Sequence, residues 1–201
     1  MIYEIQKIYR VRNSILQLLS MGILGKIGDV FHKIEYHTSN DPEIVGKRFE
    51  DYVQNLFPPK DFKIIEKTHS FDTNKERYVE SSLNPDFIFE YIPTSEKFAV
   101  ECKFRTTLNK EGQLEWSYPE QLKRYSEFQY RRKIPVFIVI GYVKTTRKWD
   151  KYDKQYYEQI QRFMFNIPLK NAKYPALYKS VFSKYVRDYK KQFSWNNGMH
   201  Y

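Results

Sequence analysis

The sequence contains a single cysteine, Cys102, among its 201 residues. One thiol cannot form a disulfide within the chain, so a small fold held together by disulfides is excluded, as is a zinc site built on cysteines. Proteins of the reducing cytoplasm generally lack disulfides. We therefore expect a cytoplasmic protein whose stability comes from a packed core, and the 41% of apolar residues is sufficient for one.

No apolar run is long enough to cross a bilayer. Residues 13–25 fall short of the roughly 20 residues that a spanning helix needs. Basic residues precede this run as in a signal peptide, but no A-x-A-like cleavage site is present. Residues 2–24 are instead predicted to form an amphipathic helix packed on the domain, so we expect no membrane partner. Association with a membrane surface is the alternative.

Several familiar catalytic patterns are also missing. The histidines lack metal-ligand spacing, and no Ser-His-Asp arrangement is visible. The segment GILGKIG at residues 22–28 lacks the G-x-x-x-x-G-K-[ST] spacing of a phosphate-binding loop, and we interpret it as a turn. No internal repeat or low-complexity linker divides the chain.

Charge, by contrast, is abundant and unevenly distributed. The net charge is +10. Residues 1–103 carry 14 Lys and Arg against 16 Asp and Glu, whereas residues 104–201 carry 20 against 8. A basic half suits a polyanionic partner such as nucleic acid. A solvated, lysine-rich surface is the alternative.

Periodicity and cap signals predict alternating helices and strands. Asp41 can cap a helix over residues 41–56, and Ser117 and Glu120 form a capping box for a helix that ends near residue 131. Strands are predicted over 62–67, 86–91, 98–105 and 134–142, a loop over 70–82, and further helices over 154–165 and 177–193. This order predicts an α/β sandwich with a central mixed sheet of four to five strands flanked by helices.

Three charged residues stand within or beside the predicted strands. Asp86 opens one strand, and Glu101 and Lys103 lie on the same face of the next. An unpaired charge among core strands is costly. Two carboxylates that converge at a sheet edge suit Mg²⁺, and a neighbouring lysine can orient or deprotonate a metal-bound water. The alternative is an exposed strand face that carries a Glu–Lys pair.

These residues resemble the signature of a known group of enzymes. Pro85-Asp86 followed by Glu101-x-Lys103 resembles the motif of the PD-(D/E)xK nuclease superfamily, which has the restriction-endonuclease-like fold. Glu50 stands where that superfamily often has a first-helix glutamate. Gln121 and Tyr125 match the Q-x-x-x-Y motif of its recombination and exonuclease branch. The resemblance covers residues 44–142 and leaves 143–201 uncovered.

The resemblance implies roles for each matched residue. Asp86 and Glu101 would bind Mg²⁺ with the backbone carbonyl of Cys102, and Mn²⁺ would substitute for Mg²⁺. Glu50 would support the metal or its water shell, and Lys103 would position or activate the attacking water. Gln121 and Tyr125 would line the site and steady Lys103 or the substrate phosphate.

Three basic residues near this site are candidates for contacts with nucleic-acid phosphates, namely Arg105, Lys123 and Arg124. The segment from Lys144 also interleaves basic and aromatic residues, which suits phosphate contact with base stacking. A lysine-rich helix that buries its tyrosines is the alternative there. We expect an N-terminal helical segment over 1–40, a nuclease-like core over 41–142, and a basic, aromatic, helical extension of the same domain over 143–201.

The sequence thus predicts a Mg²⁺-dependent deoxyribonuclease in repair, recombination or defence. A catalytically inactive nucleic-acid-binding or assembly module with the same fold is the alternative, because folds host unrelated functions. Cleavage of RNA rather than DNA stays open, as does pairing into a homodimer.

Overall fold

The computed structural model describes residues 39–68, 84–196 and 199–200. The chain divides into two compact units, residues 1–45 and 46–201, and all described elements lie in the second except the start of one helix. The predicted helix over 2–24, the glycine turn at 22–28 and the loop over 70–82 lie outside the described residues. Within the described part, no helix is both long and apolar enough to cross a membrane.

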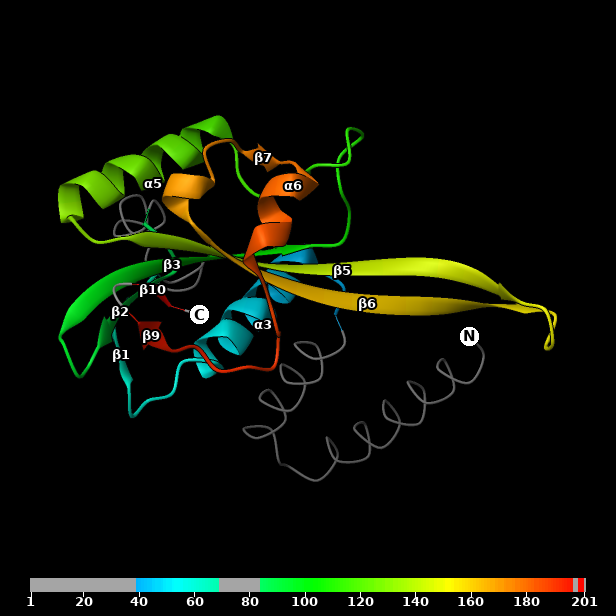
Figure 1. Ribbon diagram of the computed structural model, residues 1–201, viewed down its shortest axis with the longest axis horizontal. Helices are drawn as coiled ribbons and strands as arrows, with labels where there is room; N and C mark the ends of the chain where they lie inside the picture. The colour runs from blue at the N-terminus through cyan, green and yellow to red at the C-terminus, as the bar shows by residue number, and fades with distance from the viewer. Residues whose placement is uncertain (1–38, 69–83, 197–198, 201) are drawn as a thin grey trace, which may run out of the picture. The chain divides into compact units, whose positions relative to one another are not determined.

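A mixed six-stranded sheet forms the centre of the second unit (Figure 1). Its strand order is β1-β2-β3-β5-β6-β8. The strands are β1 (Phe62–Lys67), β2 (Phe87–Tyr91), β3 (Glu96–Arg105), β5 (Val136–Asp150), β6 (Gln155–Pro168) and β8 (Val186–Arg187). β3 and β5 pair in parallel, whereas the other neighbours pair antiparallel. The predicted α/β class with a mixed sheet is confirmed, but the predicted four to five strands are too few, because β6 and the short β8 extend the sheet beyond the four strands placed from the sequence.

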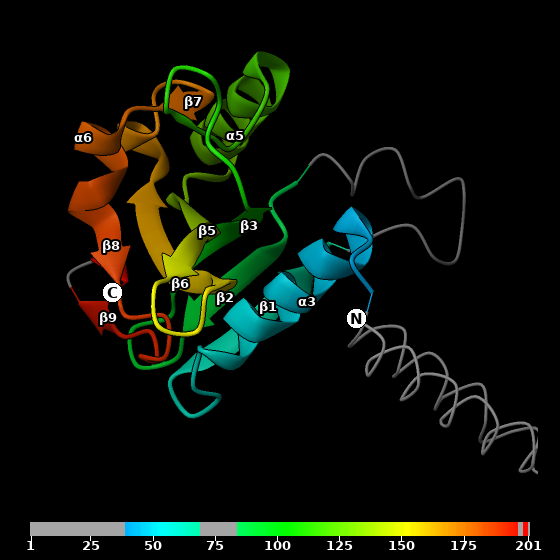
Figure 2. The ribbon, with the colours of Figure 1, turned by 90° about the vertical axis from the view of Figure 1, so that its right-hand side faces the viewer.

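Two helices cover opposite faces of this sheet, as both ribbon views show (Figures 1 and 2). They are α3 (Pro42–Asn55) and α5 (Pro119–Arg132). Asp41 caps α3 as predicted, since its Oδ1 accepts the Glu43 amide at 2.8 Å. The predicted capping box of α5 is wrong. Tyr118 is the N-cap residue, no side chain caps it, and Ser117 is buried instead; Pro119 then sets the first turn.

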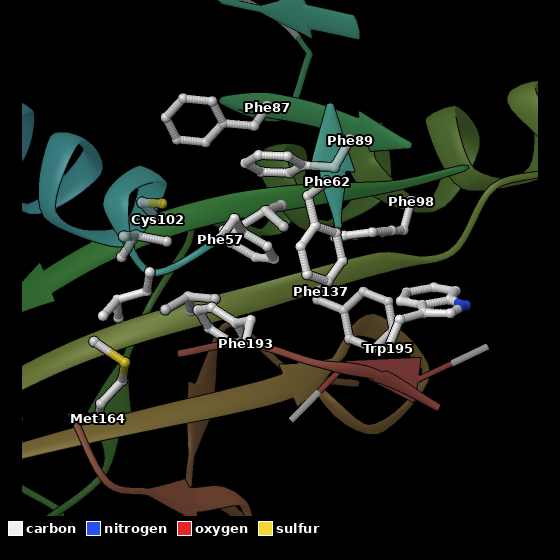
Figure 3. Close-up of a cluster of buried hydrophobic side chains, with 14 of the residues drawn as sticks. Phe57, Phe62, Phe87, Phe89, Phe98, Cys102, Phe137, Met164, Phe193 and Trp195 are labelled. Carbon is white, nitrogen blue, oxygen red and sulfur yellow. The ribbon is translucent and has the colours of Figure 1, made fainter. Parts of the chain in front are cut away.

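The core on the α3 side of the sheet is strongly aromatic (Figure 3). Phe57 stacks on Phe89 of β2 with a centroid distance of 4.1 Å and on Phe193 at 4.3 Å. The Phe193 amide also donates to the Leu56 carbonyl at 2.8 Å. The segment after β8 is therefore packed against the α3 side of the core.

A second buried cluster fills the α5 side. Tyr125 and Phe128 of α5 pack there with Ile138 and Ile140 of β5. The fully buried Trp116, which directly follows β4 (Leu114–Glu115), belongs to the same cluster. Its indole donates to the Tyr174 carbonyl at 2.8 Å. β4 pairs with β7 (Ala176–Leu177), which fixes the loops that lead into α5. Residues on both faces of β3 and β5 are consequently buried.

The C-terminal third differs most from the prediction. The predicted strand over 134–142 continues to Asp150, and the predicted helix over 154–165 is the strand β6. The predicted helix over 177–193 is reduced to α6 (Lys179–Phe182), the 3-10 turn η2 (Ser183–Tyr185) and β8. Residues 155–168 are rich in Tyr, Phe and Ile, which favour strands, and the long antiparallel pairing with β5 decides the conformation over local helical spacing.

Three shorter elements complete the described chain. They are η1 (Leu169–Asn171) after β6, and the pair β9 (Trp195–Asn196) and β10 (Met199–His200). Trp195 stacks on Phe98 of β3 with a centroid distance of 4.5 Å, and its indole donates to Glu96 at 2.6 Å. The last described residues are thus tied to the hairpin between β2 and β3.

The helix α3 packs tightly against the sheet at Gly141 of β5. A Cβ atom there would lie 2.5 Å from Cε2 of Phe49, a buried residue of α3. Gly141→Ala is expected to destabilise the fold by about 1–3 kcal/mol, because the packed ring cannot retreat freely. Each kcal/mol should lower the melting temperature by about 2–4 °C.

Gly46→Ala is the matched control, because Gly46 lies within α3 and has no heavy atom within 4 Å of an added Cβ. It should be neutral or stabilising by up to about 1 kcal/mol, since alanine favours a helix. Thermal unfolding of both variants measures the difference. Equal melting temperatures for them would contradict the proposed tight contact.

Candidate active site

Asp86 and Glu101 face one another across the β2–β3 hairpin. The register pairs Phe87 with Val100 and Ile88 with Ala99, so Asp86, just before β2, stands opposite Glu101. Asp86 Oδ2 accepts the backbone amide of Cys102 at 2.7 Å. Hairpin pairing therefore brings the two predicted carboxylates to the same end of adjacent strands, although 15 residues separate them in the sequence.

Glu101 is the most buried charged residue of the site. It is only 1% exposed and lies on the α5 side of β3, since Ala99 of the same face packs in that cluster. Its Oε1 forms an ion pair with Lys103. Its Oε2 is buried and has no hydrogen-bond partner in the described part of the chain. One oxygen of this carboxylate is thus compensated and the other is left for a ligand.

Tyr125 reaches the same carboxylate from α5, and Gln121 of that helix contacts Tyr125. Gln121 Nε2 donates to the Tyr125 hydroxyl at 2.8 Å. Burial raises the pKa of Tyr125 well above its usual value, and the charge and hydrogen bonding of Glu101 raise it further. The Tyr125 ring stacks on Trp116 with a centroid distance of 6.4 Å. A neutral phenol therefore links the helix to Glu101.

Glu50 approaches the site from α3. Burial raises its pKa, the charge of Glu101 adds to this effect, and Lys67 of β1 opposes it. Lys67 itself is held by Asp51 at 3.2 Å and by Gln54 Oε1 at 2.8 Å. Lys67 was not among the predicted site residues, because a lysine at the end of a strand carries no distinctive sequence signal.

The carboxylates repel one another more than the single ammonium compensates. Burial raises the pKa of Asp86 well above its ordinary value, and the charges of Glu101 and Glu50 raise it further. Burial acts to lower the pKa of Lys103, but Glu101 and Asp86 outweigh it and the pKa is raised. Lys103 is consequently favoured in its protonated form, whereas the charged forms of Asp86 and Glu50 are disfavoured, and a bound cation would favour them.

The side chains at this site suit a metal ion that takes few of its ligands from the protein. No three His, Cys, Asp or Glu side chains of the described residues are grouped closely enough to hold one metal ion by themselves. Mg²⁺ commonly takes one or two carboxylates and keeps several waters. The unpartnered Oε2 of Glu101 and a carboxylate oxygen of Asp86 can supply such ligands, and Glu50 interacts electrostatically with the same site.

The three basic residues predicted to contact phosphates fall into different environments. Arg105 donates to the Glu115 carbonyl at 2.6 Å and to the Trp116 carbonyl at 3.2 Å, which fixes the segment before α5. Lys123 has a 78% exposed side chain that lies 3.9 Å from Glu127. Arg124 buries its Nε, which finds no hydrogen-bond partner among the described residues. Contact with phosphates stays a prediction for all three.

The backbone amide of Cys102 donates to Asp86, a contact that was not predicted because backbone contacts leave no residue-type signal. The Cys102 thiol itself is buried on the α3 side of the sheet. No protein-family model, curated protein or solved structure matches the chain.

The raised pKa of Asp86 makes a prediction for Asp86→Asn, which keeps an acceptor oxygen for the Cys102 amide. The folded-state pKa of Asp86 lies above its unfolded value, so the wild type loses stability as pH rises from about 4 through that folded-state pKa. The variant avoids this loss. Its melting temperature in chelator should exceed that of the wild type by more at about pH 8 than at about pH 4. Each kcal/mol of difference in the free energy of unfolding should shift the melting temperature by about 2–4 °C.

Asp153→Asn is the control, since Asp153 is exposed in the turn between β5 and β6. Thermal unfolding of the control should show the same offset from wild type at both pH values. An advantage of Asp86→Asn that is no larger at the higher pH would rule out a folded-state pKa of Asp86 raised by burial and by its acidic neighbours.

Proposed function

We propose that this protein is a Mg²⁺-dependent nuclease with a restriction-endonuclease-like fold. The observation that carries the proposal is the meeting of Asp86, Glu101 and Lys103 at one end of two adjacent strands, with one buried carboxylate oxygen unpartnered. Convergence of these three side chains is what the motif resemblance requires. A pair of carboxylates pointing apart, or a lysine on the opposite face of β3, would have removed the basis for it.

Each residue has a role that follows from its environment. Asp86 and Glu101 would hold the metal, and Glu50 would complete its ligands or its water shell. A bound Mg²⁺ would lower the pKa of a coordinated water and neutralise charge on the phosphate. Lys103 stays protonated in the apo site, so it suits orienting the water and stabilising charge that develops on the phosphate.

Gln121 and Tyr125 act as positioning residues in this proposal. The Tyr125 hydroxyl accepts from Gln121 and lies against Glu101, while the ring is fixed by Trp116. This contact restrains the rotation of a carboxylate whose second oxygen must face the ligand. The chain's net charge of +10 supports a polyanionic substrate, and DNA is the one that the motif resemblance implies.

Lys103→Ala is expected to lower cleavage by about 10² to 10⁴-fold, because it removes the group that orients the water or stabilises phosphate charge. Linear, circular and branched DNA should each be incubated with Mg²⁺, and in parallel with chelator. Lys97→Ala is the matched control, because Lys97 lies on the same strand in an exposed pair with Glu90 at 3.9 Å. Cleavage by Lys103→Ala at the rate of Lys97→Ala would refute the assignment.

A metal titration separates this proposal from the inactive binding module. Mn²⁺ should bind the wild type and should bind Glu101→Gln much more weakly, as followed by calorimetry. The Gln side chain keeps the size of Glu101 and removes its charge. If the wild type binds neither Mn²⁺ nor Mg²⁺, the site does no metal-assisted hydrolysis and the binding-module interpretation replaces the nuclease.

A further inference from the structure

The two longest strands continue well beyond the rest of the sheet. Pairing of β3 with β5 ends at Arg105 and Tyr142, whereas β5 and β6 stay paired from Val143 with Arg162 to Asp150 with Gln155. No other strand pairs with residues 143–162, here called the arm, in the described part of the chain. Figure 1 shows the arm projecting past the other strands. At about 3.3 Å per residue, it extends roughly 25 Å beyond Tyr142.

The arm leaves the sheet at the end where the candidate active site lies. β3 and β5 run parallel, and Lys103 pairs with Ile140, so the arm begins three residues beyond the register position of Lys103. Pairing also places Glu101, Lys103 and Ile140 on one face. By alternation, the next residues of β5 on that face are Tyr142 and Lys144. A ligand that covers the site from this face would meet the arm directly.

The two faces of the arm differ in chemistry. One face is polar and carries Lys144, Thr146, Lys148, Asp150, Gln155, Tyr157, Gln159 and Gln161. Asp150, the only carboxylate on this face, accepts hydrogen bonds from the backbone amides of Tyr152 and Asp153 in the turn. Lysine, glutamine and threonine side chains are those that hydrogen-bond to phosphates and to base edges.

The opposite face stiffens the arm. Trp149 packs edge-on against Tyr156 with a centroid distance of 4.8 Å, and Arg147 lies 4.5 Å from the Tyr156 ring. Cross-strand pairs of this kind contribute about 0.2–1 kcal/mol each. Because an isolated hairpin is only marginally stable in water, these contacts help to keep the polar face extended and straight enough to bind.

The charge of the arm identifies the kind of ligand. Residues 143–162 contain six Lys and Arg against three Asp and Glu. None of these six cations forms a salt bridge with any residue that the structure describes. A basic ribbon whose cations have no acidic partners is complementary to a polyanion.

We propose that the polar face of the arm enters the major groove of double-stranded DNA and holds the duplex against the site. The major groove of B-DNA is about 12 Å wide and admits a two-stranded β-ribbon. The major groove of A-form RNA is deep and narrow, and side chains cannot read it. This inference rests on the proposed nuclease function for the placement of the duplex, and it selects duplex DNA over RNA and over single strands as the substrate.

The experiment measures binding in chelator by fluorescence anisotropy, so it does not depend on cleavage. The probes are a 20-base-pair DNA duplex, one of its strands, and an RNA duplex of the same sequence. The wild type should bind the DNA duplex most tightly. A DNA duplex whose cytosines carry glucosylated hydroxymethyl groups in the major groove should bind about tenfold more weakly or worse.

The double variant K144Q/K148Q removes two cations from the polar face. In a plot of log affinity for the DNA duplex against log salt concentration, the negative slope of this variant should be shallower than that of the wild type by about 1.8, which is about 0.9 for each of two lost phosphate contacts. The control is K170Q/K173Q, which removes two exposed cations from around η1, at the opposite end of β6 from the arm. The control should keep the wild-type slope, and matching circular dichroism spectra establish that all three proteins are folded.

Three results would overturn the inference. The first is that the wild type binds the single strand or the RNA duplex as tightly as the DNA duplex. The second is that K144Q/K148Q keeps the wild-type salt slope. The third is that light scattering shows K144Q/K148Q to be a monomer and the wild type a dimer, while the affinity for DNA is unaltered. Duplex binding by the arm without Mg²⁺-dependent cleavage would refute the nuclease alone, and cleavage without dependence on the arm would refute only the arm.

Discussion

Burial of the Glu101 carboxylate in the middle of the sheet constrains the rest of this structure. A buried charge is costly unless other groups compensate it, and two elements contribute to that compensation. Lys103 from the same strand neutralises one oxygen, and Tyr125 approaches from α5. Asp86 and Glu50 worsen the balance, since their negative charges repel that of Glu101. Replacing one of these acids with an apolar residue would lower this cost, and the proposed metal ligand would account for their presence together.

The aromatic core explains how the protein can hold such a site. Phe57, Phe98 and Trp195 belong to a cluster that packs α3 and the C-terminal segment onto one face of the sheet. A second cluster around Trp116 does the same for α5 on the other face. With helices fixed on both sides, the strands that carry Asp86 and Glu101 cannot separate to lower the repulsion. Rigid packing thus maintains charges that would otherwise move apart.

The sequence was sufficient for the part of the fold in which local signals and burial agree. The apolar run of β5, the Asp41 cap and the β2–β3 hairpin were predicted because propensity and packing favour the same conformation there. The capping box was wrong because the burial of Ser117 removes it from the helix end. The helix predicted over 154–165 was wrong because its conformation depends on pairing with a distant strand, which no local pattern reveals.

The same distinction applies to the site. The residue types and spacing of Asp86, Glu101 and Lys103 indicated a shared location, and the hairpin register supplies it. The sequence did not indicate that Lys67 lies near Glu50 or that Arg105 binds backbone carbonyls, because these contacts depend on how α3 and the segment before α5 pack. The arm is the clearest case. Interleaved basic and aromatic residues suggested nucleic-acid contact. Only the β-ribbon register places Lys144 and Lys148 on the face that continues from the site, and Trp149 and Tyr156 with Arg147 on the other.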